Sequence, residues 1–124
     1  MAKRKRISLD LPYPPTVNTY WRKYRGKMVL SAKGRSYKEA VRYPVLSKTR
    51  GHVFKDPDPL RVIAILFPPD RRKRDIDNSL KALLDALGND VLYSDDSQIS
   101  EIHVYRGDVH RAQGGRVAIT IERI

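Results

Sequence analysis

A nearly uninterrupted apolar segment in the middle of the chain constrains the fold most. It runs from Arg61 to Phe67, and aliphatic and β-branched residues fill it. A short apolar run of this kind predicts a strand that is covered on both faces. Pro68 and Pro69 follow directly, and they end the strand because proline has no backbone N–H for a sheet ladder. We therefore expect this segment at the centre of a sheet.

Three other segments have the alternation of apolar and polar residues that is typical of half-buried strands. Residues 5–11 and 117–121 alternate cleanly, and residues 99–104 do so less regularly. We expect the segment from Gly107 to Gly115 to be the hairpin loop between the last two strands. Residues 16–30, which follow the prolines that end the first strand, are expected to form a long connection.

Two segments have apolar residues at helical spacing. The first begins after Ser31, a preferred N-cap residue, and contains Tyr37, Ala40, Val41 and Val45. We expect Pro44 to end or kink this helix near Tyr43. The second stops at Gly88 and has an apolar stripe of Ile76, Leu80, Leu83, Leu84 and Leu87. The order β-α-β-α-β-β predicts an α+β fold, in which a small mixed β-sheet packs against two helices as a two-layer sandwich.

The composition fits a single globular domain over residues 1–124, with 40% hydrophobic and 31% charged residues. The absence of cysteine excludes a disulfide framework and a thiolate metal site. No apolar run approaches the ~18 residues of a membrane span, so we expect no membrane partner. The basic start from Met1 to Arg6 has no apolar core after it and does not resemble a secretory signal. We expect a cytoplasmic protein.

The positive charge lies almost entirely in the first part of the chain. The formal net charge is +11, and the first fifty residues hold 14 of the 25 Lys and Arg residues against Asp10 and Glu39 only. A basic surface of this kind is either solvated or binds nucleic acid, and the uneven distribution favours nucleic acid.

Aromatic side chains alternate with cations in the segment from Thr16 to Leu30. This pattern suits stacking on bases and pairing with phosphates, and it makes Asn18, Arg22 and Lys23 candidate DNA-binding residues. The alternative is that Tyr20 and Trp21 simply pack over the rim of the core.

The segment from Asp70 to Asp96 combines cations with two pairs of carboxylates. Four cations precede the first pair, a lysine follows one helical turn later, and the second pair comes after the helix: Arg71, Arg72, Lys73, Arg74, Asp75, Asp77, Lys81, Asp95 and Asp96. Cations attract phosphate, whereas clustered carboxylates repel it unless a metal ion lies between them. If the third strand runs beside the central one, both carboxylate pairs can meet at one edge. The segment predicts a site that holds a phosphodiester and a divalent cation together.

Oxygen ligands without cysteine favour Mg²⁺, with Mn²⁺ as an alternative, over zinc. The three histidines are isolated in the sequence: His52, His103 and His110. No P-loop or dinucleotide glycine pattern is present, so we expect no nucleotide cofactor. Two structural alternatives also account for the acids. The aspartates can cap the second helix, or Asp77, Lys81 and Asp85 can form salt bridges at i, i+4 spacing along it.

Together these motifs closely resemble the RusA-type Holliday junction resolvases. The similar blocks are Pro69 to Asn78, Lys81, Asp85-Ala86-Leu87, Asp95-Asp96, the proline-rich start from Leu11 to Asn18, and Ser31 to Tyr37. The similarity covers nearly the whole chain in order, and the Asp-x-Asp-Asn and Asp-Asp blocks are its most specific parts. Pro44 departs from the family pattern, in which this helix is usually continuous.

The resemblance implies a homodimeric, magnesium-dependent endodeoxyribonuclease that nicks four-way DNA junctions symmetrically in recombination and repair, and leaves 5′-phosphate and 3′-hydroxyl ends. It makes Asp75, Asp77 and Asp96 the essential acids, with Asp95 as a further possible ligand, and Lys81 the essential lysine. The four cations before Asp75 are then expected to hold the DNA backbone.

Two other hypotheses are consistent with the sequence. The chain can be a non-catalytic basic module that binds nucleic acid and whose acids only cap and form salt bridges. It can also be a metal nuclease that acts on other branched DNA, such as flaps or forks.

Overall fold

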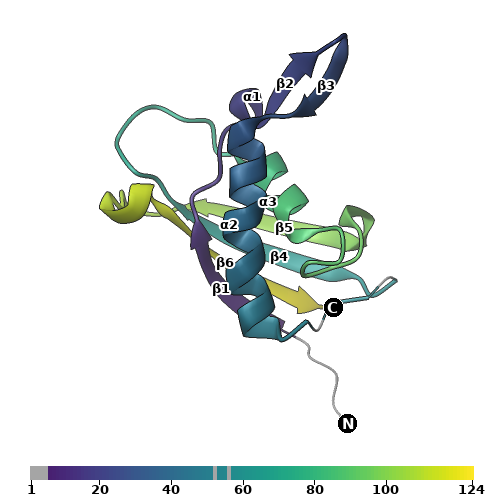
Figure 1. Ribbon diagram of the computed structural model, residues 1–124. Coiled ribbons are helices and arrows are strands. Elements are labelled where there is room, and N and C mark those ends of the chain that lie inside the picture. The colour runs from purple at the N-terminus through teal and green to yellow at the C-terminus, as the bar shows by residue number, and fades with distance from the viewer. Residues whose placement is uncertain (1–5, 52, 56) are drawn as a thin grey trace.

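The computed structural model describes residues 6–51, 53–55 and 57–124, which form a four-stranded sheet with two longer helices on one face (Figure 1). The strands are β1 (Arg6–Pro12), β4 (Leu60–Phe67), β5 (Ile99–Arg106) and β6 (Arg116–Arg123), in the spatial order β1-β6-β4-β5. The helices are α2 (Ala32–Thr49) and α3 (Leu80–Leu87). This arrangement confirms the predicted α+β two-layer fold with a mixed sheet. Lys5, expected to start the first strand, and His52 lie outside the described residues.

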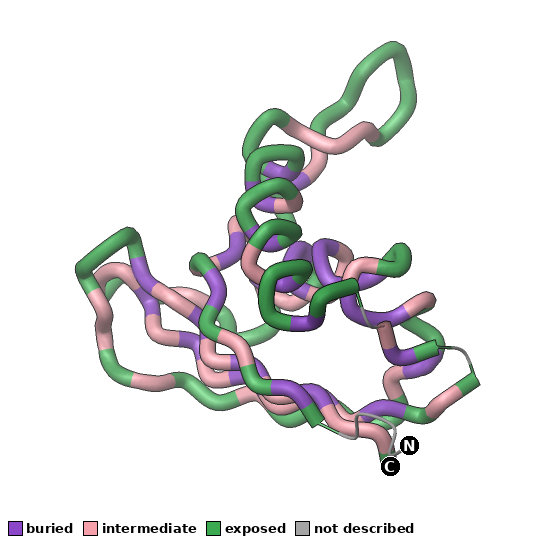
Figure 2. Tube along the Cα trace, turned by 60° about the horizontal axis from the view of Figure 1, so that its bottom comes forward, coloured by how far each residue is buried: buried purple, intermediate pink, exposed green. Residues whose placement is uncertain are grey.

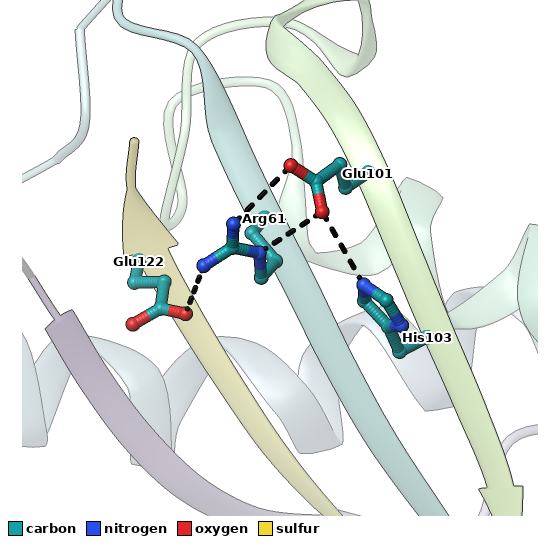
Figure 3. A network of polar contacts seen from close by, with 4 residues as sticks. All are labelled: Arg61, Glu101, His103 and Glu122. Atoms are coloured by element: carbon teal, nitrogen blue, oxygen red, sulfur yellow. Dashed lines mark hydrogen bonds and ion pairs between the residues drawn. The ribbon is translucent and has the colours of Figure 1, made fainter.

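The central strand is covered fully on one face only. Buried and half-buried residues alternate along β4, and its buried side chains, such as Val62 and Ala64, face the helices. The expectation that both faces are covered is therefore wrong. On the other face, the guanidinium carbon of Arg116 lies 4.0 Å from the centre of the Phe67 ring. Arg61 pairs there with acids on both neighbouring strands (Figure 3). Side chains of adjacent strands thus cover the apolar residues of this face in part.

Strands β5 and β6 do not form the predicted hairpin. Strand β5 pairs with β4 in parallel, and β6 lies antiparallel between β1 and β4. Ile63 of β4 is therefore opposite both His103 of β5 and Thr120 of β6. Residues 107–115 cross the end of β4 to connect its two neighbours, and they include a short 3₁₀ helix, η2 (Ala112–Gly114). The prediction failed because it assumed that strands adjacent in sequence are paired.

Helix α2 runs without interruption through Pro44. The side chain of Ser31 accepts a hydrogen bond from the Gly34 N–H, which confirms the predicted N-cap. The helix buries Tyr37, Val41 and Val45 as expected, but Ala40 is exposed. The predicted break at Pro44 is wrong. Proline removes the hydrogen bond to the Ala40 carbonyl, but Ala40 lies on the solvent side, where water can replace that bond.

The expected long connection after the first strand contains three elements. They are α1 (Val17–Tyr20), β2 (Trp21–Tyr24) and β3 (Lys27–Leu30). Strands β2 and β3 form an antiparallel hairpin that extends away from the rest of the molecule (Figures 1 and 2). Arg25 and Gly26 make the two-residue turn with φ values of 51° and 77°. Hairpin turns of two residues favour positive φ, so the Arg-Gly pair was the sequence signal that the prediction missed.

Helix α3 is shorter than the predicted second helix. It begins at Leu80, and residues 76–79 form turns before it. Ile76, expected on the buried stripe, is exposed, whereas Leu83 and Leu87 are completely buried. In the part of the chain that the structure describes, no helix is long and apolar enough to cross a membrane.

Candidate active site

The first carboxylate pair lies in the turns between β4 and α3. Asp75 and Asp77 are both exposed. Their backbone carbonyls accept hydrogen bonds from the backbone N–H groups of Asn78 and Leu80, respectively, each 3.1 Å long. These bonds shape the turns. The N-cap of α3 is Ser79, so neither aspartate caps the helix. The capping alternative therefore does not explain these two acids.

The four cations before Asp75 have different environments. Arg74 is half-buried and forms an ion pair with Asp70 at 2.8 Å, and its carbonyl accepts a hydrogen bond from Arg106 at 2.6 Å. The hydrogen bond from Arg74, together with the backbone N–H of Arg72, lowers the pKa of Asp70 to about 2. Arg74 thus holds the loop in place. The exposed members of the run are Arg71, Arg72 and Lys73.

These cations line a pocket of about 300 Å³ that also contains Asp75. Leu66 and Gly107, at the ends of β4 and β5, form part of its wall. A carboxylate and several cations thus share one concave surface at this end of the sheet. Such a surface can attract a phosphodiester while the carboxylate remains accessible to a metal ion.

The second carboxylate pair follows α3, and its two members have different surroundings. Asp95 is the N-cap of a short 3₁₀ helix, η1 (Asp96–Gln98), and forms a capping box with Gln98. The hydroxyl and backbone N–H of Ser97 donate hydrogen bonds to Asp95 and lower its pKa. Asp95 therefore has a structural role at the start of β5.

Asp96 faces α3 instead. Partial burial of its carboxyl group raises the pKa of Asp96, whereas the charge of Lys81 acts in the opposite direction. Asp85 raises the pKa of Asp96 further because both groups carry negative charge. A Cβ atom on Gly88 would lie 3.0 Å from a carboxylate oxygen of Asp96, so glycine leaves room for this side chain.

Asp85 is a neighbour of Asp96 that the sequence analysis named only as a salt-bridge partner and as part of a block similar to the family, not as a site residue. It lines a pocket of about 200 Å³ together with Gly88, Asn89, Asp95 and Asp96. Its carboxylate accepts a hydrogen bond from the Tyr20 hydroxyl and pairs with Lys38 at 3.3 Å. Its position three residues before Gly88, on the face of α3 that also carries Lys81, was the available signal.

Lys81 lies exposed in the first turn of α3. Among the residues that the structure describes, it forms no ion pair with Asp77 or Asp85 within 4.0 Å. The salt-bridge alternative is therefore not observed. Its electrostatic effect on Asp96 connects the start of α3 with the acids that follow the helix.

The structure does not bring the four predicted metal ligands into one cluster. Within residues 6–51, 53–55 and 57–124, no three side chains of His, Cys, Asp or Glu form a group that could hold a metal ion. Because β4 and β5 are parallel, Ile99 pairs with Leu60 at the start of β4, whereas Asp75 follows the end of β4. Asp75 thus belongs to the connection that follows the end of β4, and Asp96 to the connection that precedes the start of β5. The eight residues of α3, about 12 Å long, lie between them in the sequence.

The donor atoms nevertheless fit magnesium. Mg²⁺ commonly binds one or two carboxylates and takes its other ligands from water and substrate phosphates. Asp85 and Asp96 supply only oxygen donors around the space that Gly88 leaves open. Asp75 and Asp77 supply two more accessible carboxylates.

The predicted DNA-binding residues before α2 fall into two groups. Asn18 lies in α1, whose Val17 N–H donates a hydrogen bond to the Asn78 carbonyl at 2.8 Å, so α1 contacts the turn that carries Asp77. Arg22 and Lys23 lie on the projecting β2 strand. Tyr20 is completely buried at the base of the hairpin, which agrees with the alternative that it packs at the core.

Two of the histidines have contacts outside the two carboxylate pairs. His103 pairs with Glu101 at 3.3 Å on the sheet face opposite the helices (Figure 3). The backbone N–H of His110 donates to the Pro68 carbonyl at 2.7 Å.

Comparisons with known proteins give one consistent result. A family model described as "Endodeoxyribonuclease RusA" matches residues 12–122. A crossover junction endodeoxyribonuclease of Enterobacteria phage HK97 is 39% identical over 114 residues, which make up 92% of each chain. A protein with the same name from Escherichia coli K12 is 35% identical over 92% of each chain, and one from Enterobacteria phage 82 is 34% identical over 91% of each. The matched segment includes every carboxylate of the candidate site and Lys81.

Proposed function

Because the chain belongs to the RusA family of endodeoxyribonucleases, we propose that it cuts four-way DNA junctions by paired symmetric nicks in a magnesium-dependent reaction. The observation that carries this proposal is the match along 92% of both chains to a protein named for crossover junctions. Its role is then in DNA recombination and repair. We also propose the cytoplasm as its location, because its substrate is DNA.

The acids and the lysine have separate roles in the proposed reaction. Asp75, Asp77 and Asp96, with Asp95 as a further ligand, would hold Mg²⁺ together with oxygen atoms of the DNA once DNA binding has brought these acids together. When bound, the metal supplies a Lewis acid and lowers the pKa of a coordinated water. Lys81 lies over the scissile phosphate and offsets the negative charge that develops in the transition state.

The raised pKa of Asp96 and the nearby Lys81 charge support this assignment. Burial next to Asp85 leaves the ionised carboxylate poorly stabilised, and a cation relieves that repulsion. Because no three ligands are grouped in the described residues, we propose that the metal site forms only when the bound DNA phosphate joins the acids. Cleavage is thereby linked to the correct placement of DNA.

The cationic segments hold the DNA backbone. Arg71, Arg72 and Lys73 are exposed beside the first carboxylate pair, and Arg74 fixes the loop that carries them. Asn18 contacts the phosphate close to the acids, and Arg22 and Lys23 act further along the DNA. These contacts give affinity and orientation, and they carry no direct sequence information.

The experiment is a cleavage assay with labelled four-way junction, fork, flap and duplex DNA, each with Mg²⁺ and with EDTA. We expect cuts at symmetric positions of the junction that require Mg²⁺, and no cuts in the duplex. Equal cleavage of forks or flaps would favour a nuclease for other branched DNA. Binding without cleavage in Mg²⁺ and Mn²⁺ would favour the non-catalytic module.

A further inference from the structure

The β2–β3 hairpin is a cationic arm without compensating acids. It carries Arg22, Lys23, Arg25 and Lys27, and no Asp or Glu occurs from Val17 to Ser31. Within the described residues none of these cations forms an ion pair. By contrast, Arg61, Arg116 and Arg123 on the main sheet all pair with carboxylates. Both views show the hairpin beyond the two layers of the fold (Figures 1 and 2). Such an arm attracts a polyanion.

The end of the hairpin also exposes apolar side chains. Tyr24 is 48% exposed and Met28 is 60% exposed. The guanidinium carbons of Arg22 and Arg25 lie 5.1 and 5.3 Å from the centre of the Tyr24 ring. An exposed aromatic ring with adjacent arginines is the combination on which nucleic-acid bases stack.

The base of the hairpin is fixed to the elements that carry the candidate site. The Ser31 N–H donates to the Tyr20 carbonyl at 2.9 Å, and the Ser31 hydroxyl donates to the Thr19 carbonyl at 2.5 Å. Gly34 of α2 lies so close that a Cβ atom there would be 2.7 Å from the Tyr20 carbonyl oxygen. Through Val17, the same base contacts the turn that carries Asp77. A group bound at the tip is therefore held in a defined relation to the acids.

We propose that the tip of this hairpin enters the branch point of a DNA junction, where Tyr24 stacks on the exposed face of a base pair. This inference rests on the proposed function and adds the element that selects branched DNA. In a continuous duplex, each base pair is covered by its neighbours, so an aromatic ring outside the helix finds no free face. At a branch the stack is interrupted, and a face becomes accessible. The four cations of the hairpin hold the phosphates of the DNA arms next to the branch. They contribute as much to the binding of duplex DNA as to the binding of a junction.

The test compares the affinities of Tyr24 variants for four-way junctions and for duplex DNA of the same length, in EDTA so that the strands stay intact. Stacking contributes about 1–3 kcal/mol per base, so Tyr24→Ala should weaken junction binding by about 5- to 150-fold. Duplex affinity should not change. Tyr24→Phe keeps the ring and should bind like the wild type. Tyr43→Ala is the matched control, because Tyr43 is an 80% exposed tyrosine on α2.

A second measurement reports the contact directly. 2-Aminopurine placed at the branch should change its fluorescence when wild-type protein or Tyr24→Phe binds, and much less with Tyr24→Ala at saturation. Thermal melting verifies that each variant is folded. Equal loss of junction and duplex affinity in Tyr24→Ala, or no loss at all, would overturn the inference. If the wild type itself neither prefers nor cuts junctions, the proposed function fails instead.

Discussion

The hydroxyl of Tyr20 donates a hydrogen bond to the carboxylate of Asp85, which lies 65 residues further along the chain. Tyr20 is completely buried at the base of the hairpin, and Asp85 lines the pocket that contains Asp96. Burial and this hydrogen bond raise the pKa of Tyr20, so the hydroxyl stays protonated and remains a donor. The bond therefore connects the projecting arm to the candidate active site.

Tyr20→Phe should destabilise the protein, because it removes this hydrogen bond and leaves Asp85 only its ion pair with Lys38 among the described residues. Hydrogen bonds to charged groups contribute about 1.5–3 kcal/mol, and we expect a loss of that order in the free energy of unfolding. Urea denaturation measures it. Tyr43→Phe, at an exposed position, is the control and should have no effect. An unchanged unfolding free energy for Tyr20→Phe would show that water satisfies Asp85 equally well.

The two adjacent acids Asp95 and Asp96 should respond differently to substitution. Asp96→Asn and Asp77→Asn are expected to abolish cleavage while junction binding is kept or strengthened, because each removes a metal ligand and a negative charge near phosphate. Asp95→Ala should lower the melting temperature, because it removes the cap of η1, and should reduce cleavage less. Parallel cleavage, binding and melting assays distinguish these outcomes. If the Asp96→Asn variant still cleaves junctions, Asp96 has no role in the proposed mechanism.

Lys81→Ala should lower the cleavage rate far more than the junction affinity. A charge contact made in the transition state can contribute ~2.7–4 kcal/mol, or about 10²- to 10³-fold in rate. Single-turnover cleavage at saturating protein measures the rate separately from binding. Lys48→Ala, at an exposed lysine in the last turn of α2, is the matched control. If Lys81→Ala cleaves at a rate near that of the wild type, Lys81 is only a surface charge.

The basic run before Asp75 should separate into binding and structural residues. The double substitution of Arg71 and Lys73 by alanine should make the salt dependence of junction binding shallower by about two phosphate contacts, without a change in melting temperature. Arg74→Ala should lower the melting temperature, because Arg74 pairs with Asp70 and holds the loop. Titrations at several salt concentrations test the first expectation. An unchanged slope would show that this loop points away from DNA.

Symmetric nicks require two candidate sites related by a two-fold axis, so we expect a homodimer. Light scattering at micromolar concentration measures its mass. A mixed dimer with one wild-type protomer and one Asp77→Asn protomer should nick only one strand of each junction. A monomer that cuts both strands symmetrically would contradict this prediction.

Local sequence patterns were sufficient to predict the two longer helices and the four strands of the main sheet. The alternation in β1 and β6, the apolar run of β4 and the cap at Ser31 all depend on neighbours along the chain. The acids and cations from Asp70 to Asp96 stood out for the same reason, because their spacing is visible without a fold.

Tertiary structure decided which of these parts meet. Periodicity shows that one face of a strand is buried, but it does not show which element buries it or which strand lies beside it. Strand β5 pairs with β4 and does not form the predicted hairpin with β6. Helix α2 continues through Pro44 because its packed side remains intact. The parallel pairing of β4 and β5 also places Asp75 and Asp96 in the connections at opposite ends of β4, whereas Asp85, which accepts a hydrogen bond from Tyr20, lines the same pocket as Asp96. These contacts join residues far apart in sequence, and only the packing of the folded chain determines them.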